Sequence, residues 1–178
     1  MDIAFFDIET TDLAADVGTI LCACVKPLGG PVVTLEASNN LKPLARSDKK
    51  LVVDLINKLA EFDLVVSYYG RYFDVPYVRS RAVLHRVHRP ISFLHLDLHL
   101  TTKQGLRLSN NRLVTCEKFL GLQNEKTPLT RKVWKEAELG NAKSMRHILT
   151  HCAADVKVLE EYYAAMVPHV KNIGRILL

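Results

Sequence analysis

Residues 3–36, IAFFDIETTDLAADVGTILCACVKPLGGPVVTLE, decide the fold because they contain three predicted β-strands in succession. Apolar runs cover 3–8, 19–26 and 32–36, and turn-prone residues separate them. The pair of glycines between the second and third runs suits a hairpin turn. This part of the chain therefore predicts three antiparallel strands.

Downstream of this stretch, predicted helices and strands alternate. The expected elements are a helix over 51–62, a strand over 64–67, a helix over 74–84, a strand over 93–100, a helix over 111–120, a loop with a short helix within 123–140, and a long helix from Gly140 to about residue 166. Three strands followed by this alternation predict an α/β fold, with a central mixed sheet flanked by helices. At 178 residues, the whole chain 1–178 is expected to form a single domain.

The composition is that of an ordinary globular protein, because 48% of the residues are hydrophobic and 24% are charged, which excludes a disordered or collagen-like chain. A net charge of +5 is compatible with a polyanionic partner without demonstrating one. Cys22, Cys24, Cys116 and Cys152 match neither a zinc finger nor a disulfide framework, so we expect buried free thiols in a reducing compartment. No segment has the features of a signal peptide or the ~20 apolar residues of a membrane span. We therefore expect a cytoplasmic protein without membrane contact.

Four acidic side chains occupy places where a purely structural role is costly. Asp7 and Glu9 lie two apart on the first strand, so their side chains share one face. Asp155 lies beside the apolar stripe of the last helix, with His151 one turn before it, and Asp74 opens a helix after an apolar strand. Each residue alone also fits a solvated strand end, a surface His–Asp pair or an ordinary helix cap. Together they indicate one carboxylate-rich site for Mg²⁺ or Mn²⁺, and two such ions ~3.5–4 Å apart are a known solution for phosphodiester displacement.

Three motifs in the chain resemble those of the DEDD superfamily of 3′–5′ exonucleases, which includes DnaQ-like and YprB-like domains. The motifs are FDIETT (6–11), YGRYFDVP (69–76) and HCAAD (151–155). The resemblance spans residues 3 to about 166 and is nearest to YprB-like domains and to the proofreading domains of family B DNA polymerases. It implies a ribonuclease H-like fold and the hydrolysis of single-stranded nucleic acid from its 3′ end, with DNA slightly favoured over RNA.

The resemblance also implies roles for the acidic residues. Asp7, Glu9 and Asp155 would bind one metal ion, Asp7 would share a second, and Asp74 would hold metal-bound water or the second ion. His151 would position or deprotonate the attacking water. The cofactors would thus be two Mg²⁺ or Mn²⁺ ions, and the products nucleoside 5′-monophosphates.

The chain departs from the family pattern at two positions. The histidine-bearing branch has four residues between His and Asp, whereas His151 and Asp155 have the three-residue spacing of the tyrosine-bearing branch. Tyr69 stands where close relatives carry Asn, and it either stacks on a base of the substrate or packs within the fold.

Further substrate contacts are implied just after the first motif. Thr10 and Thr11 would hold the terminal nucleotide, and Leu13 would be an apolar wedge beside its base; all three equally suit a turn. A basic cluster with one aromatic residue lies further along the chain, and its members are Lys126, Arg131, Lys132, Trp134 and Lys135. The cluster predicts either a grip on a single strand or a charged helix face with Trp134 anchored in the core.

A second polar group, His95, Asp97 and His99, alternates on one predicted strand and could coordinate a transition metal. We expect instead that Asp97 lies at the active-site end of the sheet or bonds the neighbouring backbone. Two other functions fit the sequence: a structure-specific endonuclease of the same fold, and a non-catalytic nucleic-acid-binding module.

Overall fold

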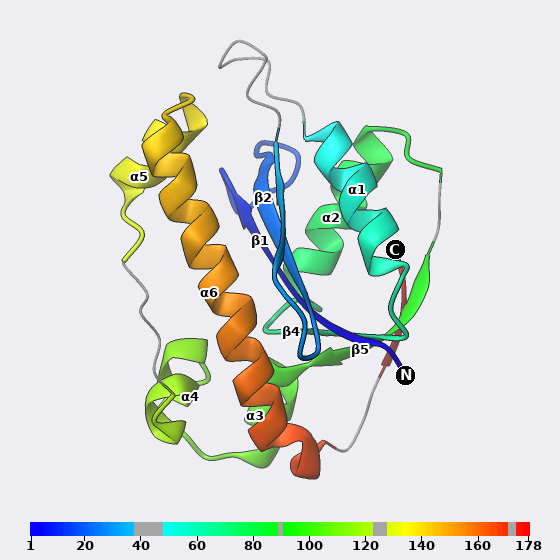
Figure 1. The fold of residues 1–178 in the computed structure, drawn as a ribbon, viewed down its shortest axis with the longest axis vertical. Coiled ribbons are helices and arrows are strands. Elements are labelled where there is room, and N and C mark those ends of the chain that lie inside the picture. Colours follow the sequence, from blue (N-terminus) through cyan, green and yellow to red (C-terminus); the bar gives the residue numbers. More distant parts are fainter. Residues whose placement is uncertain (38–47, 89–90, 123–127, 171–173) are drawn as a thin grey trace.

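A computed structural model describes residues 1–37, 48–88, 91–122, 128–170 and 174–178. Its elements, drawn in Figure 1, are β1 (Ile3–Thr10), β2 (Ile20–Pro27), β3 (Val33–Glu36), α1 (Lys49–Leu59), β4 (Leu64–Ser67), α2 (Asp74–Leu84), β5 (Ser92–Asp97), α3 (Leu98–Gly105), α4 (Leu113–Leu120), α5 (Arg131–Glu138), α6 (Ala142–Met166), the 3₁₀ turn η2 (Val167–His169) and β6 (Gly174–Leu177).

The strands form one mixed sheet in the order β3-β2-β1-β4-β5-β6. β1 pairs with β2, and β2 with β3, in antiparallel register, whereas β4 is parallel to both β1 and β5. This arrangement confirms the predicted α/β fold with three leading antiparallel strands. The parallel pairing aligns Ser67 at the end of β4 with Asp97 at the end of β5.

Helices cover both faces of the sheet. Figure 1 shows α6 on one side and α1 and α2 on the other. On β1, Phe6 and Ile8 pack into the core beneath α1 and α2, whereas Phe5 packs into the core beneath α6. Because side chains alternate along a strand, Asp7 and Glu9 are directed to the α6 side.

The long helix α6 covers the face of the sheet to which Asp7 and Glu9 are directed. Asn141 caps its first turn by accepting hydrogen bonds from the backbone N–H groups of Lys143 and Ser144. Residues that recur every three or four positions bury it against β1 and β2. The Sγ of Cys152 donates to the carbonyl oxygen of Asp7 at 3.5 Å, so the helix meets β1 at Asp7.

Two strands differ from the sequence prediction. The strand expected over 93–100 ends at Asp97, because the Asp97 carboxylate caps α3 by accepting from the backbone N–H of His99. His99 therefore lies on α3 and does not share a strand face with His95. The strand β6, which the sequence did not predict, pairs antiparallel with β5. The short helix expected within 123–140 is α5, and residues 123–127 lie outside the described residues.

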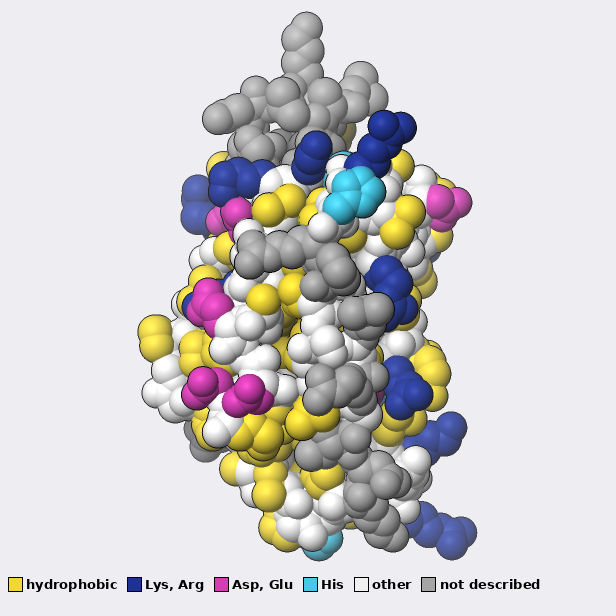
Figure 2. Space-filling view, turned by 90° about the vertical axis from the view of Figure 1, so that its right-hand side faces the viewer, with side chains coloured by type: hydrophobic (Ala, Val, Ile, Leu, Met, Phe, Trp, Pro, Cys, Tyr) yellow, Lys and Arg dark blue, Asp and Glu magenta, His cyan; other side chains and the backbone are white. Residues whose placement is uncertain are grey.

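The structure also bears on the expectations for the cysteines, for membrane spans and for surface charge. All four cysteines are free and buried, as predicted. Within the described part of the chain, none of the helices combines the length and hydropathy that a bilayer crossing requires. On the face shown in Figure 2, Lys and Arg side chains recur along the right-hand edge, and most Asp and Glu side chains lie on the left. The positive charge is thus unevenly spread over this face.

Candidate metal and nucleotide site

Glu9 at the end of β1 meets His151 and Asp155 of α6. One potential ligand atom from each of the three side chains lies within 4.8 Å of the others, and all three residues keep part of their surface accessible. His151 Nε2 is 3.6 Å from Asp155 Oδ2, one helical turn away. The other ring nitrogen of His151, Nδ1, is buried without a hydrogen-bond partner in the described structure. Two carboxylates and an imidazole at this spacing can hold a divalent cation.

Asp7 lies close enough to this group for strong electrostatic interaction. Burial, followed by the negative charges of Asp74, Glu9 and Asp155, raises the pKa of Asp7 well above its usual range. The structure therefore brings together the four acids that the sequence singled out. Such a cluster of like charges disfavours the ionised carboxylates unless a cation offsets them, so the donor set fits Mg²⁺ or Mn²⁺.

Asp74 is the most deeply buried of the four, with 3% of its surface exposed. Its Oδ1 accepts a hydrogen bond from the backbone N–H of Ile8 at 3.2 Å, which ties the start of α2 to β1. Burial raises the pKa of Asp74 to about 7, although this hydrogen bond opposes the shift. Asp74 was also expected to suit a helix cap; it is the first residue of α2, and its carboxylate bonds across to β1.

The turn before Asp74 is held by Asp97. Asp97 Oδ1 accepts from the backbone N–H of Tyr69 at 2.9 Å, and Oδ2 accepts from that of Arg71 at 3.0 Å. Gly70 is required between them, because a Cβ there would lie 2.2 Å from the Ser67 hydroxyl oxygen. The expectation that Asp97 bonds the neighbouring backbone is confirmed.

The loop after β1 contains the predicted substrate residues. Thr10 Oγ1 donates to the carbonyl oxygen of Asp12 at 2.8 Å, and Thr11 Oγ1 accepts from the backbone N–H of Thr19 at 2.9 Å. Both hydroxyls therefore stabilise the loop, which is the turn role that the sequence left open. Leu13 is 85% exposed.

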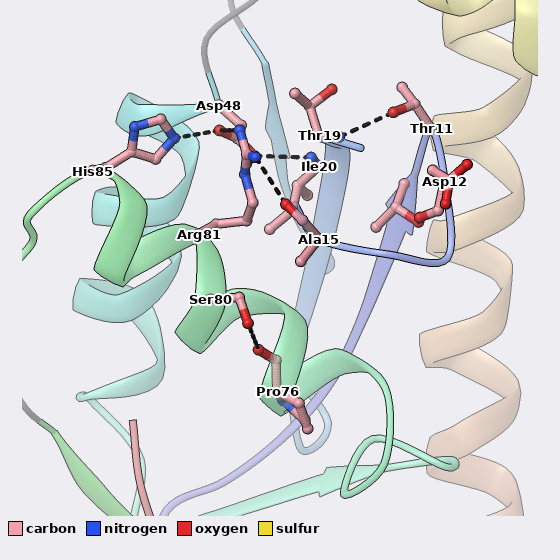
Figure 3. Close-up of polar contacts among 11 residues, drawn as sticks. Thr11, Asp12, Ala15, Thr19, Ile20, Asp48, Pro76, Ser80, Arg81 and His85 are labelled. Carbon is pink, nitrogen blue, oxygen red and sulfur yellow. Dashed lines mark hydrogen bonds and ion pairs between the residues drawn. The ribbon is translucent and has the colours of Figure 1, made fainter. Parts of the chain in front are cut away.

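A buried ion pair anchors this loop to α1 and α2 (Figure 3). The Asp48 carboxylate accepts from Arg81 Nε and Nη2, each at 2.8 Å, from the backbone N–H of Ile20, and from His85. Arg81 Nη1 donates to the carbonyl oxygen of Ala15 at 3.0 Å, within the loop. Burial acts to raise the pKa of Asp48, but the hydrogen bonds from Arg81, Ile20 and His85 outweigh it and hold the pKa below its usual value.

A cavity of about 550 Å³ lies between this loop and α5. It is lined by Ile8, Glu9, Thr10, Thr11, Asp12, Leu13, Phe73, Arg131 and Trp134. Glu9 thus belongs both to the possible metal-binding group with His151 and Asp155 and to this cavity. The cavity also contains Thr10, Thr11 and Leu13, to which the family resemblance assigns the terminal nucleotide. Tyr69, the other substrate residue that was predicted, does not line this cavity.

The basic cluster on α5 has the charged helix face and the core-anchored Trp134 that were one of the two alternatives. Trp134 is half-buried, packs against the core beneath α6, and lines the cavity together with Arg131. Lys132 and Lys135 are exposed, as on an ordinary charged helix face. Lys126 lies outside the described residues.

Comparison with known proteins identifies the family. A family model described as RNase_H superfamily matches residues 4–167. The chain belongs to the RNase_H superfamily. This membership confirms the ribonuclease H-like relationship indicated by the motifs and gives the protein a nuclease-type, hydrolytic function. No curated protein matches the sequence.

Solved structures show the same fold. The family B DNA polymerase from the hyperthermophilic archaeon Pyrobaculum calidifontis matches with a TM-score of 0.77 and 17% sequence identity, over 94% of this chain. The match covers 24% of the polymerase, so this RNase_H superfamily chain spans about a quarter of its length. At this identity, the likeness concerns the fold alone.

Sequence reasoning missed two groups of residues at the site. Asp48 and Arg81 hold the loop after β1, and the signals that could have revealed them are an acid at the start of a helix and an arginine on an otherwise apolar helix face. Phe73 also lines the cavity, whereas the sequence analysis included it only as the residue before Asp74 in the second motif.

Proposed function

We propose that residues 1–178 form a single, cytoplasmic, ribonuclease H-like exonuclease domain of the DEDD type. It would degrade single-stranded nucleic acid from the 3′ end, preferring DNA slightly over RNA, and release nucleoside 5′-monophosphates. The observation that carries this proposal is the convergence of Asp7, Glu9, Asp74 and Asp155 with His151, of which Glu9 also lines the cavity of about 550 Å³.

Each residue has a role consistent with its environment. Asp7, Glu9 and Asp155 would hold a metal ion, with Asp7 and Asp74 at a second position. Two Mg²⁺ or Mn²⁺ ions supply activation of a water molecule and stabilisation of the leaving 3′ oxygen when bound. His151, beside Asp155, would orient the attacking water and accept its proton.

The cavity supports the substrate assignment. Its loop wall, with Thr10, Thr11 and the exposed Leu13, would hold the terminal nucleotide by backbone groups and by apolar contact with the base. The Thr10 and Thr11 hydroxyls would act indirectly, because they keep the loop in shape. Tyr69 would contact the strand outside the cavity.

A strand-shortening assay tests the proposal. Linear DNA and RNA strands labelled at the 5′ end are incubated with Mg²⁺ or Mn²⁺, and a ladder of 3′-shortened products is expected. Asp7→Ala should reduce the rate at least ~100-fold, since it removes a residue that acts on both metal positions. The matched control is Asp54→Asn, which changes an acid on α1 that pairs with Lys50.

Two outcomes would contradict the proposal. Absence of a ladder in wild type, or a ladder that persists in Asp7→Ala, would remove the assignment. Cleavage of a circular single strand would favour an endonuclease, and binding of DNA without hydrolysis would favour a non-catalytic module.

A further inference from the structure

Three aromatic side chains form a surface ledge next to the candidate site: Tyr69 and Tyr72 from the turn before α2, and His99 from α3. Tyr69 is 48% exposed and Tyr72 is 56% exposed. The Tyr69 ring lies 5.4 Å from the Tyr72 ring and 4.9 Å from the His99 ring, measured between centroids. The two tyrosine rings are therefore accessible from solvent, and the half-buried His99 ring meets the Tyr69 ring edge-on.

The backbone beneath the ledge is strained and firmly held. Tyr69 has a φ of 67°, in the left-handed region that residues with a Cβ rarely adopt. The Asp97 carboxylate holds this conformation through the N–H groups of Tyr69 and Arg71, and it also accepts from the N–H of His99. One buried acid thus fixes the backbone at two of the three rings. Strain of this kind is retained at functional sites, where surrounding contacts over-determine it.

The ledge is continuous with the candidate site along the chain. Tyr72 precedes Phe73, which lines the 550 Å³ cavity with Glu9, and Asp74 follows directly. The backbone N–H groups of Tyr72 and Phe73 both donate to the carbonyl oxygen of Tyr69, at 3.0 and 3.1 Å. A strand whose terminal nucleotide occupies the cavity would therefore have the ledge within reach of its next bases.

One basic residue belongs to the same turn as the two tyrosines. It is Arg71, which is exposed. It also lines a second cavity, of about 230 Å³, with Arg79 and His95. Exposed aromatic rings bind single-stranded nucleic acid because bases stack on them, and a cation on the same turn adds attraction for the phosphates.

We infer that the ledge stacks the bases that precede the terminal nucleotide of a single strand, and that Asp97 is the positioning residue that presents it. The inference rests on the proposed exonuclease for the direction of the strand. Because every base has a π-face, the ledge favours single strands over duplexes without selecting a sequence. The ledge makes the affinity for a strand increase with its length, whereas the carboxylates carry out hydrolysis.

The experiment compares substrates that reach the ledge with one that does not. The p-nitrophenyl ester of thymidine 5′-monophosphate has one base, whereas dT12 extends past the cavity. For Tyr72→Ala, KM for dT12 should rise about 10-fold, within the range expected for the loss of one stacked base, and the rise should grow with length from dT3 to dT12. Tyr72→Phe, which keeps the ring, should restore the wild-type KM. The matched control is Phe119→Ala on α4, which removes an aromatic side chain that is 60% exposed and distant in sequence from the ledge.

Abasic strands separate stacking from a structural effect. In wild type, a 12-residue strand without bases upstream of its terminal nucleotide should lose at least as much affinity as Tyr72→Ala loses for dT12. For that abasic strand, Tyr72→Ala should weaken binding little further. The ledge is overturned if Tyr72→Ala and Phe119→Ala change KM equally, or if the effect does not depend on strand length.

The ledge can also be tested if the protein hydrolyses nothing. Fluorescence anisotropy of labelled dT12 then measures binding directly, with Ca²⁺ in the buffer. Weaker binding by Tyr72→Ala, about 10-fold, would support the ledge while the exonuclease assignment fails. Equal binding by wild type and Tyr72→Ala would overturn the ledge.

Discussion

Asp97 shows how a single buried carboxylate can organise a site that it does not enter. Its oxygens accept from the backbone of Tyr69 and Arg71 on one side and of His99 on the other. The turn that leads to Asp74 is thereby fixed to the end of β5. A charge that is costly to bury is stabilised here by three N–H groups.

His95, two residues earlier, is expected to make the stability of the folded protein depend on pH. Its side chain is buried and its Nε2 lies 2.8 Å from the Ser67 hydroxyl oxygen. Burial lowers the pKa of His95 to about 4, whereas an unfolded histidine titrates near 6.5. Between these values the unfolded chain binds a proton that the folded protein does not. The contribution of His95 to the free energy of unfolding is therefore complete above about pH 6.5 and declines as the pH falls towards 4.

Because of His95, we expect the free energy of unfolding to fall by about 2 kcal/mol when the pH is lowered from 7 to 4.5. Urea unfolding at the two pH values measures the cost, and His95→Gln should remove it. His88→Gln, which changes an exposed histidine, is the control. Equal pH dependence in wild type and His95→Gln would show that the buried ring does not stay neutral.

At the level of single residues, strand alternation and helical spacing predicted that Asp7, Glu9 and Asp155 could converge. The conformation of Tyr69 could not be predicted in this way. Left-handed residues are usually signalled by Gly or Asn, and a tyrosine gives no such signal. Only the three-dimensional contact with Asp97 explains it.

Among the elements, the loop after β1 depends on helices that are distant in sequence. Arg81 of α2 reaches both the Asp48 carboxylate before α1 and the carbonyl oxygen of Ala15 in the loop. The pair is almost fully buried, so its charges are little screened by water.

Arg81→Met should destabilise the protein by about 3–5 kcal/mol, because it leaves the Asp48 charge buried without its guanidinium partner. The midpoint and slope of urea unfolding give this value. Lys50→Ala breaks the exposed pair with Asp54 and should change stability by less than about 0.5 kcal/mol. A loss below about 1 kcal/mol in Arg81→Met would mean that the ion pair does not anchor the loop.

Prediction of elements succeeded where local signals were clear. The helix Asp74–Leu84 has the predicted bounds, and Gly121, with a φ of 65°, ends α4 as expected. The strand prediction over 93–100 was wrong at its end because the alternating leucines continue into α3, where Leu98 is also fully buried. β6 was missed because its position depends on a long-range pairing with β5.

For the whole molecule, we expect divalent metal to stabilise the fold. In metal-free protein the clustered carboxylates repel one another, and a bound cation offsets this repulsion. At about 100 times the dissociation constant, binding adds ~2.7 kcal/mol, which corresponds to roughly 5–10 °C in Tm for a chain of this size. Differential scanning fluorimetry in EDTA and in Mg²⁺ measures the shift.

Asp7→Asn provides the contrast, since it removes one negative charge from the cluster. It should have a higher Tm than wild type in EDTA and a smaller shift on addition of Mg²⁺. Asp54→Asn should keep the wild-type shift. If Mg²⁺ leaves the Tm of wild type unchanged, the cluster is not a metal site.

The docking of α6 against β1 also has a consequence for biosynthesis. Glu9 and Asp155 meet at one site although 155 − 9 = 146 positions separate them along the chain. Contacts this far apart form late, because a large loop has to close before they contribute. A ribosome-bound chain that lacks α6 has only part of the ligand set, so the candidate metal site should form only after α6 has been synthesised.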